Sequence, residues 1–454
     1  MGFLNSIYPD QSSKNGARQW LGLAFASLAF ALPIAWFVWG AGDVIIDRMF
    51  RVMFVLFLLG VGQKTPRLYY KDKLIWLCTL LILVLMVGYI WQRFSVPEEL
   101  FSGSKARIFI PAFCFFVVVA YGINATPKAS PFLLLITAGA GLLVHLSSVP
   151  TDTWLSGWRG ERIDFGFRNA QHAGIMFATA LLAGALFLPR ASSLPLKARM
   201  LVLPLLVGFI LLMFFGVIAT QTRAIWLGLV LSAIVLFVLC TVILLAGHRS
   251  VRWRALTRPA ATGTGILLAG LAALYFMAGN ITQRLSDETV NAVTIAEAAQ
   301  LETVPRSSVG VRIGSWSAAR EWIAERPIFG WGGDSASKLI KQSPYFDEEF
   351  KNRYGHLHNS YLETLTAVGS VAVACMIAIT FLIAWRTIVT WRQGRIPTDV
   401  FLFSCAFFSF WLTANMFESY IRYDSGAFLN AVIGGFVYSW YLRSQHAPPR
   451  HQPS

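Results

Sequence analysis

Residues 201–247, LVLPLLVGFILLMFFGVIATQTRAIWLGLVLSAIVLFVLCTVILLAG, hold two apolar runs separated by the short turn Gln221–Thr222. Each run has about 20 residues, the length at which a helix crosses roughly 30 Å of hydrocarbon. A helix satisfies its own backbone groups in lipid, and the alternating pattern of a membrane β-barrel is absent from the sequence. The stretch therefore predicts two membrane-spanning helices joined by a tight turn, with Arg223 at the membrane boundary.

Similar apolar runs recur along the whole chain. Its 454 residues are 56% hydrophobic and 13% charged, with a mean hydropathy of +0.57. A soluble domain of this size could not bury so much apolar surface, and the first run is too long for a cleavable signal peptide. The sequence therefore predicts an all-α, polytopic membrane protein with about twelve spans. They lie near residues 20–39, 44–62, 74–92, 107–122, 131–148, 171–189, 201–220, 223–247, 260–278, 359–385, 399–417 and 427–443.

Lysine and arginine set the orientation of these spans. They concentrate in four loops, KTPRLYYKDK, PRASSLPLKARM, HRSVRWRALTR and RTIVTWRQGR. With an even number of spans these loops share one side with both termini, and the positive-inside rule makes that side the cytoplasm. The net charge of +15 is therefore an orientation signal, and no nucleic-acid partner is expected.

The predicted organisation has three parts. Residues 1–278 contain the first nine spans, residues 279–358 form an external loop with short helices, and residues 359–454 contain the last three spans and a cytoplasmic tail. A loop of this length in a compact protein is usually functional. Within it, RSSVGVRIGSWSAAREWIAERP predicts a helix that Ser307 or Ser308 caps and Pro327 ends. A shorter helix, SASKLIKQ, follows Asp334 as its expected cap.

Arginines on the external side run against the positive-inside pattern and call for an explanation. Guanidinium groups match phosphate oxygens with a planar fork and keep their charge at any working pH. A single outer arginine can simply snorkel to the membrane surface, but a group of them predicts a cationic site for a lipid phosphate or diphosphate. The arginines in question are Arg159, Arg162 and Arg168 in the loop 149–170, Arg223 at a span entry, and Arg312 on the loop helix.

Two histidines precede the tenth span in GHLHNSYLETLTAVG, residues 355–369. A histidine changes charge near neutral pH, so His358 suits a general base, with His356 as a weaker candidate. The simpler alternative is that Asn359 caps the helix and both histidines are solvated. Glycines on either side of the histidines favour a functional site over this alternative, because Gly369 and the turn PIFGWGGD allow another backbone or a ligand to approach closely. Trp331 and the other aromatic residues near this turn form either a loop core or a wall for sugar stacking.

Taken together, these stretches resemble the signature of the O-antigen ligase and O-antigen polymerase superfamily. The turn RPIFGWGGD matches the superfamily's glycine turn, and HLHNSYLETLTAVG matches its histidine–asparagine entry into the next span. GFRNAQHAG and QTRAIWLG resemble two further elements, with Thr222 in place of a serine. Chain length, span number and the position of the large loop are most similar to the lipopolysaccharide O-antigen ligase.

The resemblance implies a glycosyltransferase of the GT-C type in the bacterial inner membrane. Its donor would be a glycan on undecaprenyl diphosphate, its acceptor a sugar hydroxyl of lipid A–core, and its active site would face the periplasm among inner-membrane lipid. No cofactor or metal is expected, since the external loops carry no DxD motif. His358, Arg223 and Arg312 are the expected catalytic residues. The expected substrate-binding residues are Arg159, Arg162, Arg168, His356, Asn359, Gly330, Trp331 and Gly332.

Three alternatives stay open. An O-antigen polymerase uses the same donor with a second lipid-linked glycan as acceptor, and a protein O-oligosaccharyltransferase uses a serine or threonine. A transporter of lipid-linked glycans also fits twelve spans. Transporters usually place their ionisable residues near the membrane midplane, whereas here the unusual charges lie at one face.

Overall fold

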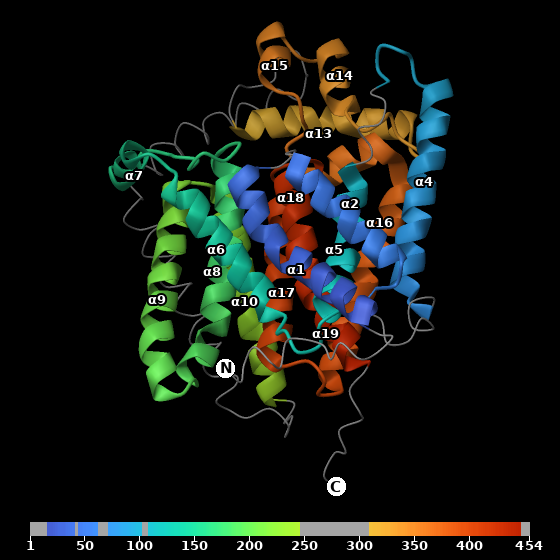
Figure 1. Cartoon of the computed structure of the whole chain (residues 1–454). Helices are drawn as coiled ribbons and strands as arrows, with labels where there is room; N and C mark the ends of the chain where they lie inside the picture. Colours follow the sequence, from blue (N-terminus) through green and yellow to red (C-terminus); the bar gives the residue numbers. More distant parts are fainter. Residues whose placement is uncertain (1–15, 41–43, 62–70, 102–107, 246–307, 446–454) are drawn as a thin grey trace.

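The computed structural model describes residues 16–40, 44–61, 71–101, 108–245 and 308–445. Within these ranges the chain is helical and has no strand, which confirms the all-α prediction. Long helices form a bundle, one helix lies across one end of it, and two short helices stand beyond that helix (Figure 1). We call this the α13 end, after the helix that crosses it.

The long helices follow the predicted spans. Every predicted span overlaps a helix except residues 260–278, which lie outside the described residues. The helices are α1 (Gly16–Trp39), α2 (Val44–Leu58), α4 (Lys73–Ser95), α5 (Phe109–Asn124), α6 (Phe132–Ser147), α8 (Ala170–Ser192), α9 (Leu196–Ala219), α10 (Arg223–Leu245), α16 (Ser360–Arg392) and α17 (Thr398–Asn415). The last run joins α18 (Asp424–Leu429), the π-helical η4 (Asn430–Gly434) and α19 (Gly435–Ser444).

Six of these helices, α1, α4, α8, α9, α10 and α16, are long and apolar enough to cross a membrane. A seventh candidate is α6 together with α7 (Thr151–Trp158), which are bent by 98° relative to each other. The outward faces support a membrane environment, because Leu205 and Leu211 on α9 are 66% and 62% exposed. The chain is therefore a multi-pass membrane protein, and the total of twelve spans stays a prediction.

A buried polar network joins four helices at the opposite end of the bundle. Asp72 accepts hydrogen bonds from Arg386 at 2.6 Å and from Tyr121 at 3.0 Å, and it also contacts the hydroxyl of Tyr438. The same carboxylate caps α4 through the amide of Leu74 at 3.0 Å. Both carboxylate oxygens thus have hydrogen-bond partners. The network holds α4, α5, α16 and α19 together through Asp72, Tyr121, Arg386 and Tyr438.

The short helices at the α13 end have a core of their own. They are α13 (Ser308–Glu325), α14 (Ser335–Gln342) and α15 (Glu348–Arg353). Trp322, Trp331, Ile340 and Leu357 are buried together there. The two tryptophans therefore belong to a loop core. Asp334 precedes α14 as predicted, but its side chain makes no capping hydrogen bond and pairs with Arg422.

Helix α16 is broken at Gly369, and the turn after α13 docks into the break. Gly369 has φ +73°, and a Cβ there would collide with the carbonyl of Ile328. The amides of Trp331 and Gly332 donate to the carbonyls of Thr366 and Ala367 at 2.8 and 2.9 Å. The amide of Ser370 donates to Pro327 at 2.8 Å. The predicted close backbone approach at Gly369 is therefore confirmed, and it fixes the first turns of α16 against the loop.

Candidate functional site

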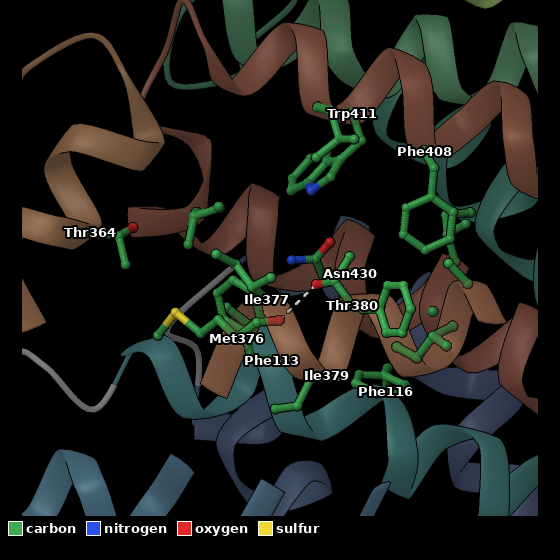
Figure 2. A pocket seen from close by; sticks show the side chains of 18 of the residues that line it. Phe113, Phe116, Thr364, Met376, Ile377, Ile379, Thr380, Phe408, Trp411 and Asn430 are labelled. Atoms are coloured by element: carbon green, nitrogen blue, oxygen red, sulfur yellow. Dashed lines mark hydrogen bonds between the residues drawn. The ribbon is translucent and has the colours of Figure 1, made fainter. Parts of the chain in front are cut away.

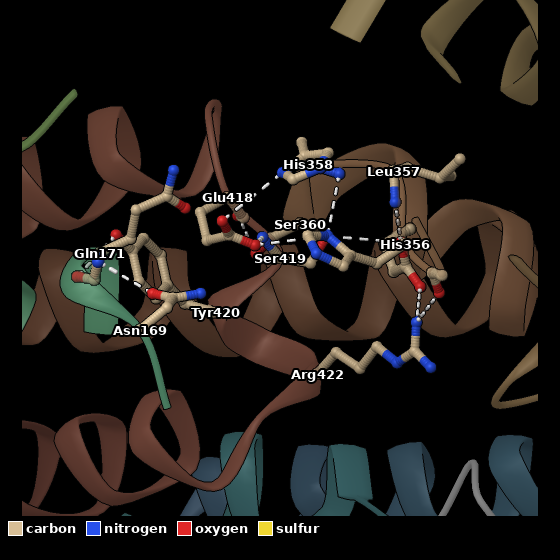
Figure 3. A network of polar contacts seen from close by, with 12 residues as sticks. Asn169, Gln171, His356, Leu357, His358, Ser360, Glu418, Ser419, Tyr420 and Arg422 are labelled. Carbon is tan, nitrogen blue, oxygen red and sulfur yellow. Dashed lines mark hydrogen bonds and ion pairs between the residues drawn. The ribbon is translucent and has the colours of Figure 1, made fainter. Parts of the chain in front are cut away.

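Two histidines and a glutamate meet at the α13 end (Figure 3). Nδ1 of His356 lies 3.3 Å from one carboxylate oxygen of Glu418, and Nδ1 of His358 lies 3.6 Å from the other. The two imidazole centroids are 4.0 Å apart. His356 and His358 precede α16, whereas Glu418 lies in the short connection between α17 and α18. We call these three residues the histidine–glutamate cluster.

The backbone holds His358 in an uncommon conformation. Its φ is +50°, in the left-handed region that a residue other than glycine occupies only at a cost. Asn359 follows directly and caps α16, accepting from the amides of Tyr361 and Leu362 at 2.9 and 3.1 Å. The cap and the strained residue together turn the histidine side chain towards Glu418. Neither ring nitrogen of His358 has a hydrogen-bond partner among the described residues.

The connection between α17 and α18 positions Glu418. The hydroxyl of Ser360, at the start of α16, donates to the carbonyl of Glu418 at 2.9 Å. The amide of Ser419 donates to the Glu418 carboxylate at 2.9 Å. The hydroxyl of Tyr420 donates to the carbonyl of Gln171 at 3.1 Å, at the start of α8. The connection is therefore tied to α8 and α16 at once, and the Glu418 side chain is 2% exposed.

A second buried carboxylate braces the loop beside the cluster. Glu363 accepts from Arg422 at 2.7 Å and from the amide of Leu357, between the two histidines, also at 2.7 Å. Arg422 donates to the carbonyl of Gly355 at 2.8 Å and pairs with Asp334. Since both charges of the Glu363–Arg422 pair are satisfied, its contacts are structural, and they hold the histidine-bearing loop in place.

Three predicted arginines surround the cluster. Arg312 donates to the carbonyl of Phe417, the residue before Glu418, at 3.4 Å. Arg168 stacks on the ring of Tyr423 at 4.1 Å. Arg162 donates to the carbonyl of Thr220 at 3.2 Å. Arg312 from α13 thus contacts the residue before Glu418, whereas Arg168 and Arg162, both from the loop before α8, contact a ring five residues after Glu418 and the turn before α10.

The electrostatics of the cluster follow from burial and from these neighbours. The pKa of His356 is lowered to about 3. Burial is the largest cause, and the charges of His358, Arg422 and Arg168 also lower this pKa, whereas the charge of Glu418 raises it. Burial raises the pKa of Glu418, but the two histidines outweigh that effect and lower the pKa of the carboxyl to about 2. At neutral pH the cluster therefore holds an ionised glutamate and a neutral His356.

The tyrosine beside the cluster responds to the same charges. Burial and the charge of Glu418 raise the pKa of Tyr420, and Arg312 and Arg162 act in the opposite direction. Both arginines therefore lie within electrostatic reach of Tyr420.

The cluster could also accommodate a metal ion, because its ligand atoms all lie within 4.8 Å of one another. The surrounding arginines oppose a divalent cation, however, and suit an anionic ligand better.

The two remaining predicted arginines lie at one contact between a loop and a turn. The amide of Ile163 donates to the carbonyl of Ala219 at 3.2 Å, and the Gln221 side chain donates to Gly160 at 2.6 Å. Arg159 and Arg223 flank this contact, and both are exposed. The loop 159–163 and the turn before α10 are thus joined, with Arg162 on the side towards Tyr420.

Four residues expected to bind substrate have structural contacts here. The backbones of Gly330, Trp331 and Gly332 belong to the turn docked into the α16 break, and the Trp331 indole donates to the carbonyl of Trp322 at 2.8 Å. Asn359 caps α16, as the simpler alternative predicted, but the two histidines are not solvated, because their side chains are only 18% and 15% exposed. Their contacts explain these residue types without a ligand, and a role in substrate binding stays a prediction for all four.

An apolar cavity of about 600 Å³ lies below the cluster between α5, α16, α17 and the η4–α19 run. Tyr361, Thr364 and Ile421 line it near the cluster, and Ile379 and Ile383 line it deeper in the bundle. Figure 2 shows Thr364 at one side of the cavity and mostly apolar side chains around the cavity. The hydroxyl of Ser360 donates to the carbonyl of Glu418 and accepts from the amide of Ile421. The cavity wall and the cluster are therefore connected by hydrogen bonds through Ser360.

Comparison with known proteins agrees with the motifs. Residues 208–377 match the family model described as O-Antigen ligase. The matched region starts in α9, includes Arg223, Arg312, His356 and His358, and ends within α16. The match confirms the resemblance to the O-antigen ligase superfamily over these residues. No curated protein matches the chain.

Sequence reasoning missed the residues that complete the site. Glu418, Tyr420 and Arg422 lie in NMFESYIRYDSG, residues 415–426, a short polar interruption between the last two predicted spans. Such an interruption reads as an ordinary connection between helices. The available signal is that two acids and an arginine fall within seven residues on the side where the outer arginines also lie.

Proposed function

We propose that this protein is a GT-C-type glycosyltransferase that moves an O-antigen glycan from undecaprenyl diphosphate to lipid A–core. The reaction takes place at the periplasmic face of the bacterial inner membrane, which corresponds to the α13 end. The single observation that carries the proposal is that His358 meets Glu418 while Arg168 lies within electrostatic reach of His356, and Arg162 and Arg312 lie within reach of Tyr420. A proton acceptor and a cationic anion site thus share one end of the bundle, directly above an apolar cavity.

The arginines neutralise the leaving diphosphate. Arg312 and Arg223 clamp its oxygens, assisted by Arg159, Arg162 or Arg168, and they stabilise the charge that grows as the glycosidic bond breaks. Such preorganised electrostatic stabilisation is usually the largest contribution to catalysis. Arginine supplies it without a metal because its fork binds two oxygens and its charge is permanent.

His358 acts as the general base of a single displacement that inverts the anomeric centre. The acceptor hydroxyl oxygen bonds to the anomeric carbon while the bond from that carbon to the diphosphate oxygen breaks. The hydroxyl proton moves to His358, and the electron pair leaves with undecaprenyl diphosphate. Glu418 lies against the histidines, so we assign it no nucleophilic role. Among the described residues, Nε2 of His358 has no hydrogen-bond partner, which supports the assignment because a base needs a free lone pair.

The cavity below the cluster suits the polyprenyl chain of the donor. Its lining is almost wholly apolar, and it runs from Tyr361 near the cluster to Ile383 deeper in the bundle. A lipid chain lying there would bring its diphosphate to the residues around Glu418. This arrangement lets the chain enter sideways from the bilayer while the sugars stay in water.

The acceptor separates this function from its relatives, and a defined assay tests it. Purified protein in detergent is incubated with an undecaprenyl-diphosphate glycan and, in turn, with lipid A–core, a second lipid-linked glycan or a serine-containing protein. We expect product with lipid A–core. Product only with the second glycan would indicate a polymerase, and product only with protein would indicate a protein O-oligosaccharyltransferase. A preparation that moves the donor across vesicles but forms no product would instead be a transporter.

A further inference from the structure

We propose that Glu418 is the positioning residue for His358, fixing the tautomer and orientation of the base. This inference rests on the proposed function, because it assigns Glu418 a role in the same transfer reaction. Nothing in the sequence motifs points to this residue, which lies far along the chain from the histidines. It acts through His358 and does not touch the reacting atoms.

The geometry gives Glu418 one carboxylate oxygen for each histidine. One oxygen lies 3.6 Å from Nδ1 of His358, and the other lies 3.3 Å from Nδ1 of His356. A distance of 3.6 Å is an ion-pair contact that becomes a hydrogen bond with a shift of about 0.6 Å, and such bonds often tighten only when substrate binds. With its proton on Nδ1, His358 presents Nε2 as the free acceptor.

The carboxylate cannot turn away from the histidines. Its side chain is 2% exposed, and its backbone carbonyl is held by the Ser360 hydroxyl at 2.9 Å. Ser360 is two residues after His358, so the base and its partner are fixed by the same turn of the chain. The strained φ of His358, +50°, shows that the surroundings determine where this imidazole points.

The charges around Glu418 keep it ionised. The carboxylate faces His356 and His358 from the loop before α16 and Arg312 from α13, and Tyr420 follows it on its own segment. Arg168 and Arg422 also act electrostatically on His356. The pKa of Glu418 at about 2 agrees with a permanent negative charge. A buried anion of this kind stabilises the imidazolium that forms when His358 takes a proton.

The proton balance is simple. In the displacement, the acceptor hydroxyl proton moves to Nε2 of His358, and the Nδ1 proton stays between His358 and Glu418. The carboxylate is not protonated at any point, and the positive imidazolium is neutralised by it until the proton passes to water. His356 occupies the other oxygen and limits the rotation of the carboxylate.

The test is Glu418→Gln in the purified full-length protein, with Asp424→Asn as the matched control. Asp424 is an exposed carboxylate at the first residue of α18, so the control removes the same charge without touching the histidines. We expect Glu418→Gln to lower kcat by about 10²–10⁴-fold, since a misoriented general base loses the rate enhancement that general-base catalysis provides. The donor KM should change less than about threefold, because the arginines that bind the diphosphate remain. The control should keep kcat within about twofold.

The pH profile separates positioning from a merely structural role. Removing the negative charge makes the imidazolium of His358 less stable, so the acid limb of kcat should move to lower pH. Glu418→Asp keeps a carboxylate, and its acid limb should stay near the wild-type position with a smaller loss of kcat. If Glu418→Gln does not fold, Glu418→Asp alone decides, and a raised donor KM with unchanged kcat would overturn the proposal.

Two further outcomes are decisive. A Glu418→Gln protein with wild-type kcat and an unmoved acid limb would overturn the positioning role. Loss of wild-type activity on chelation, restored by zinc, would make the cluster a metal site and would equally overturn it. Failure of the wild type to form any product counts against the proposed function itself. An inactive His358→Ala protein beside a fully active Glu418→Gln protein counts against the positioning role alone.

Discussion

The two ends of the bundle bury charge in opposite ways. At the end away from α13, Asp72 bonds Arg386 at 2.6 Å and Tyr438 closes the network, so both carboxylate oxygens have partners. At the α13 end, His358 lies beside Glu418 with neither ring nitrogen hydrogen-bonded among the residues that the structure describes. The first arrangement is complete without a ligand, whereas the second leaves a polar group ready for one.

This difference teaches how to separate a structural from a functional polar cluster in a membrane protein. A buried ion pair with all partners present holds helices together, and removing one partner destabilises the fold. A buried imidazole whose ring nitrogens make no hydrogen bond adds little to stability, so its presence points to a chemical role. Substitutions at the two ends should therefore change different measured quantities.

The largest expected effect is on catalysis at the α13 end. His358→Ala should lower transfer by at least about 10²–10⁴-fold, because general-base catalysis contributes that much. Its thermal midpoint in detergent should stay near the wild-type value, since the ring makes no hydrogen bond. Transfer is measured with purified protein, donor and lipid A–core. Retention of most of the activity would remove His358 from the mechanism.

The opposite result is expected for Asp72→Asn. Arg386, whose side chain is 10% exposed, would keep a buried charge without its counterion. Breaking a buried pair in this way costs about 3–5 kcal/mol of stability. We expect a clearly lower thermal midpoint but near wild-type kcat for the protein that remains folded. A selective loss of kcat at an unchanged midpoint would contradict the division between the two ends.

Replacing an arginine by lysine sharpens the anion-site part of the comparison. Arg312→Lys and Arg223→Lys each keep the charge but lose the planar fork, so kcat should fall by about 10²-fold. Arg320→Lys is the matched control, because Arg320 lies on the same helix α13 and is exposed. We expect the control to behave as wild type. Full activity of Arg223→Lys would make Arg223 an interfacial anchor only.

A smaller effect is expected at the break in α16. Gly369→Ala places a Cβ against the Ile328 carbonyl and forces alanine to φ +73°, which costs about 1–3 kcal/mol. The thermal midpoint should fall, and kcat should fall with it because the two histidines of the cluster directly precede the first turns of α16. Gly208→Ala is the control, since nothing lies within 4 Å of a Cβ there. An unchanged midpoint for Gly369→Ala would show that the docked turn is not needed.

The smallest expected effect is a pH dependence of stability. The pKa of His356 is about 3 in the folded protein and about 6.5 in the unfolded chain. Between these values the unfolded state binds more protons, so stability rises with pH by up to about 1.4 kcal/mol per unit. His356→Asn should flatten the change in thermal midpoint between pH 5.0 and 6.5, where Glu418 does not titrate. Parallel curves for both proteins would contradict a buried, neutral His356.

Local patterns were enough to predict most of the fold. The apolar runs located the long helices, and Pro327 marked the end of α13 because proline cannot continue a helix. The same patterns predicted that His358, Arg312 and the outer arginines lie on one side of the membrane. These predictions depend on composition and on spacing within a single helix, which the sequence displays directly.

Long-range pairing was beyond the reach of the same reasoning. Glu418 meets His358 only because α16 and α17 pack against each other and return their ends to one face, and no local pattern encodes that contact. Gly330 and Trp331 pointed to a substrate site in the sequence, yet they contact the carbonyls of the α16 break and of Trp322. A glycine-rich turn has the same composition whether it admits a ligand or another backbone.

The most direct test of the central claim is an experimental structure of the His358→Ala protein with an undecaprenyl-diphosphate glycan bound. We predict that the diphosphate contacts Arg312 and at least one of Arg162 and Arg168, with the polyprenyl chain in the cavity lined by Tyr361. The sugar at the diphosphate should face the space left by the His358 ring. A diphosphate bound near Arg386 at the other end of the bundle, or beyond reach of residue 358, would contradict the account.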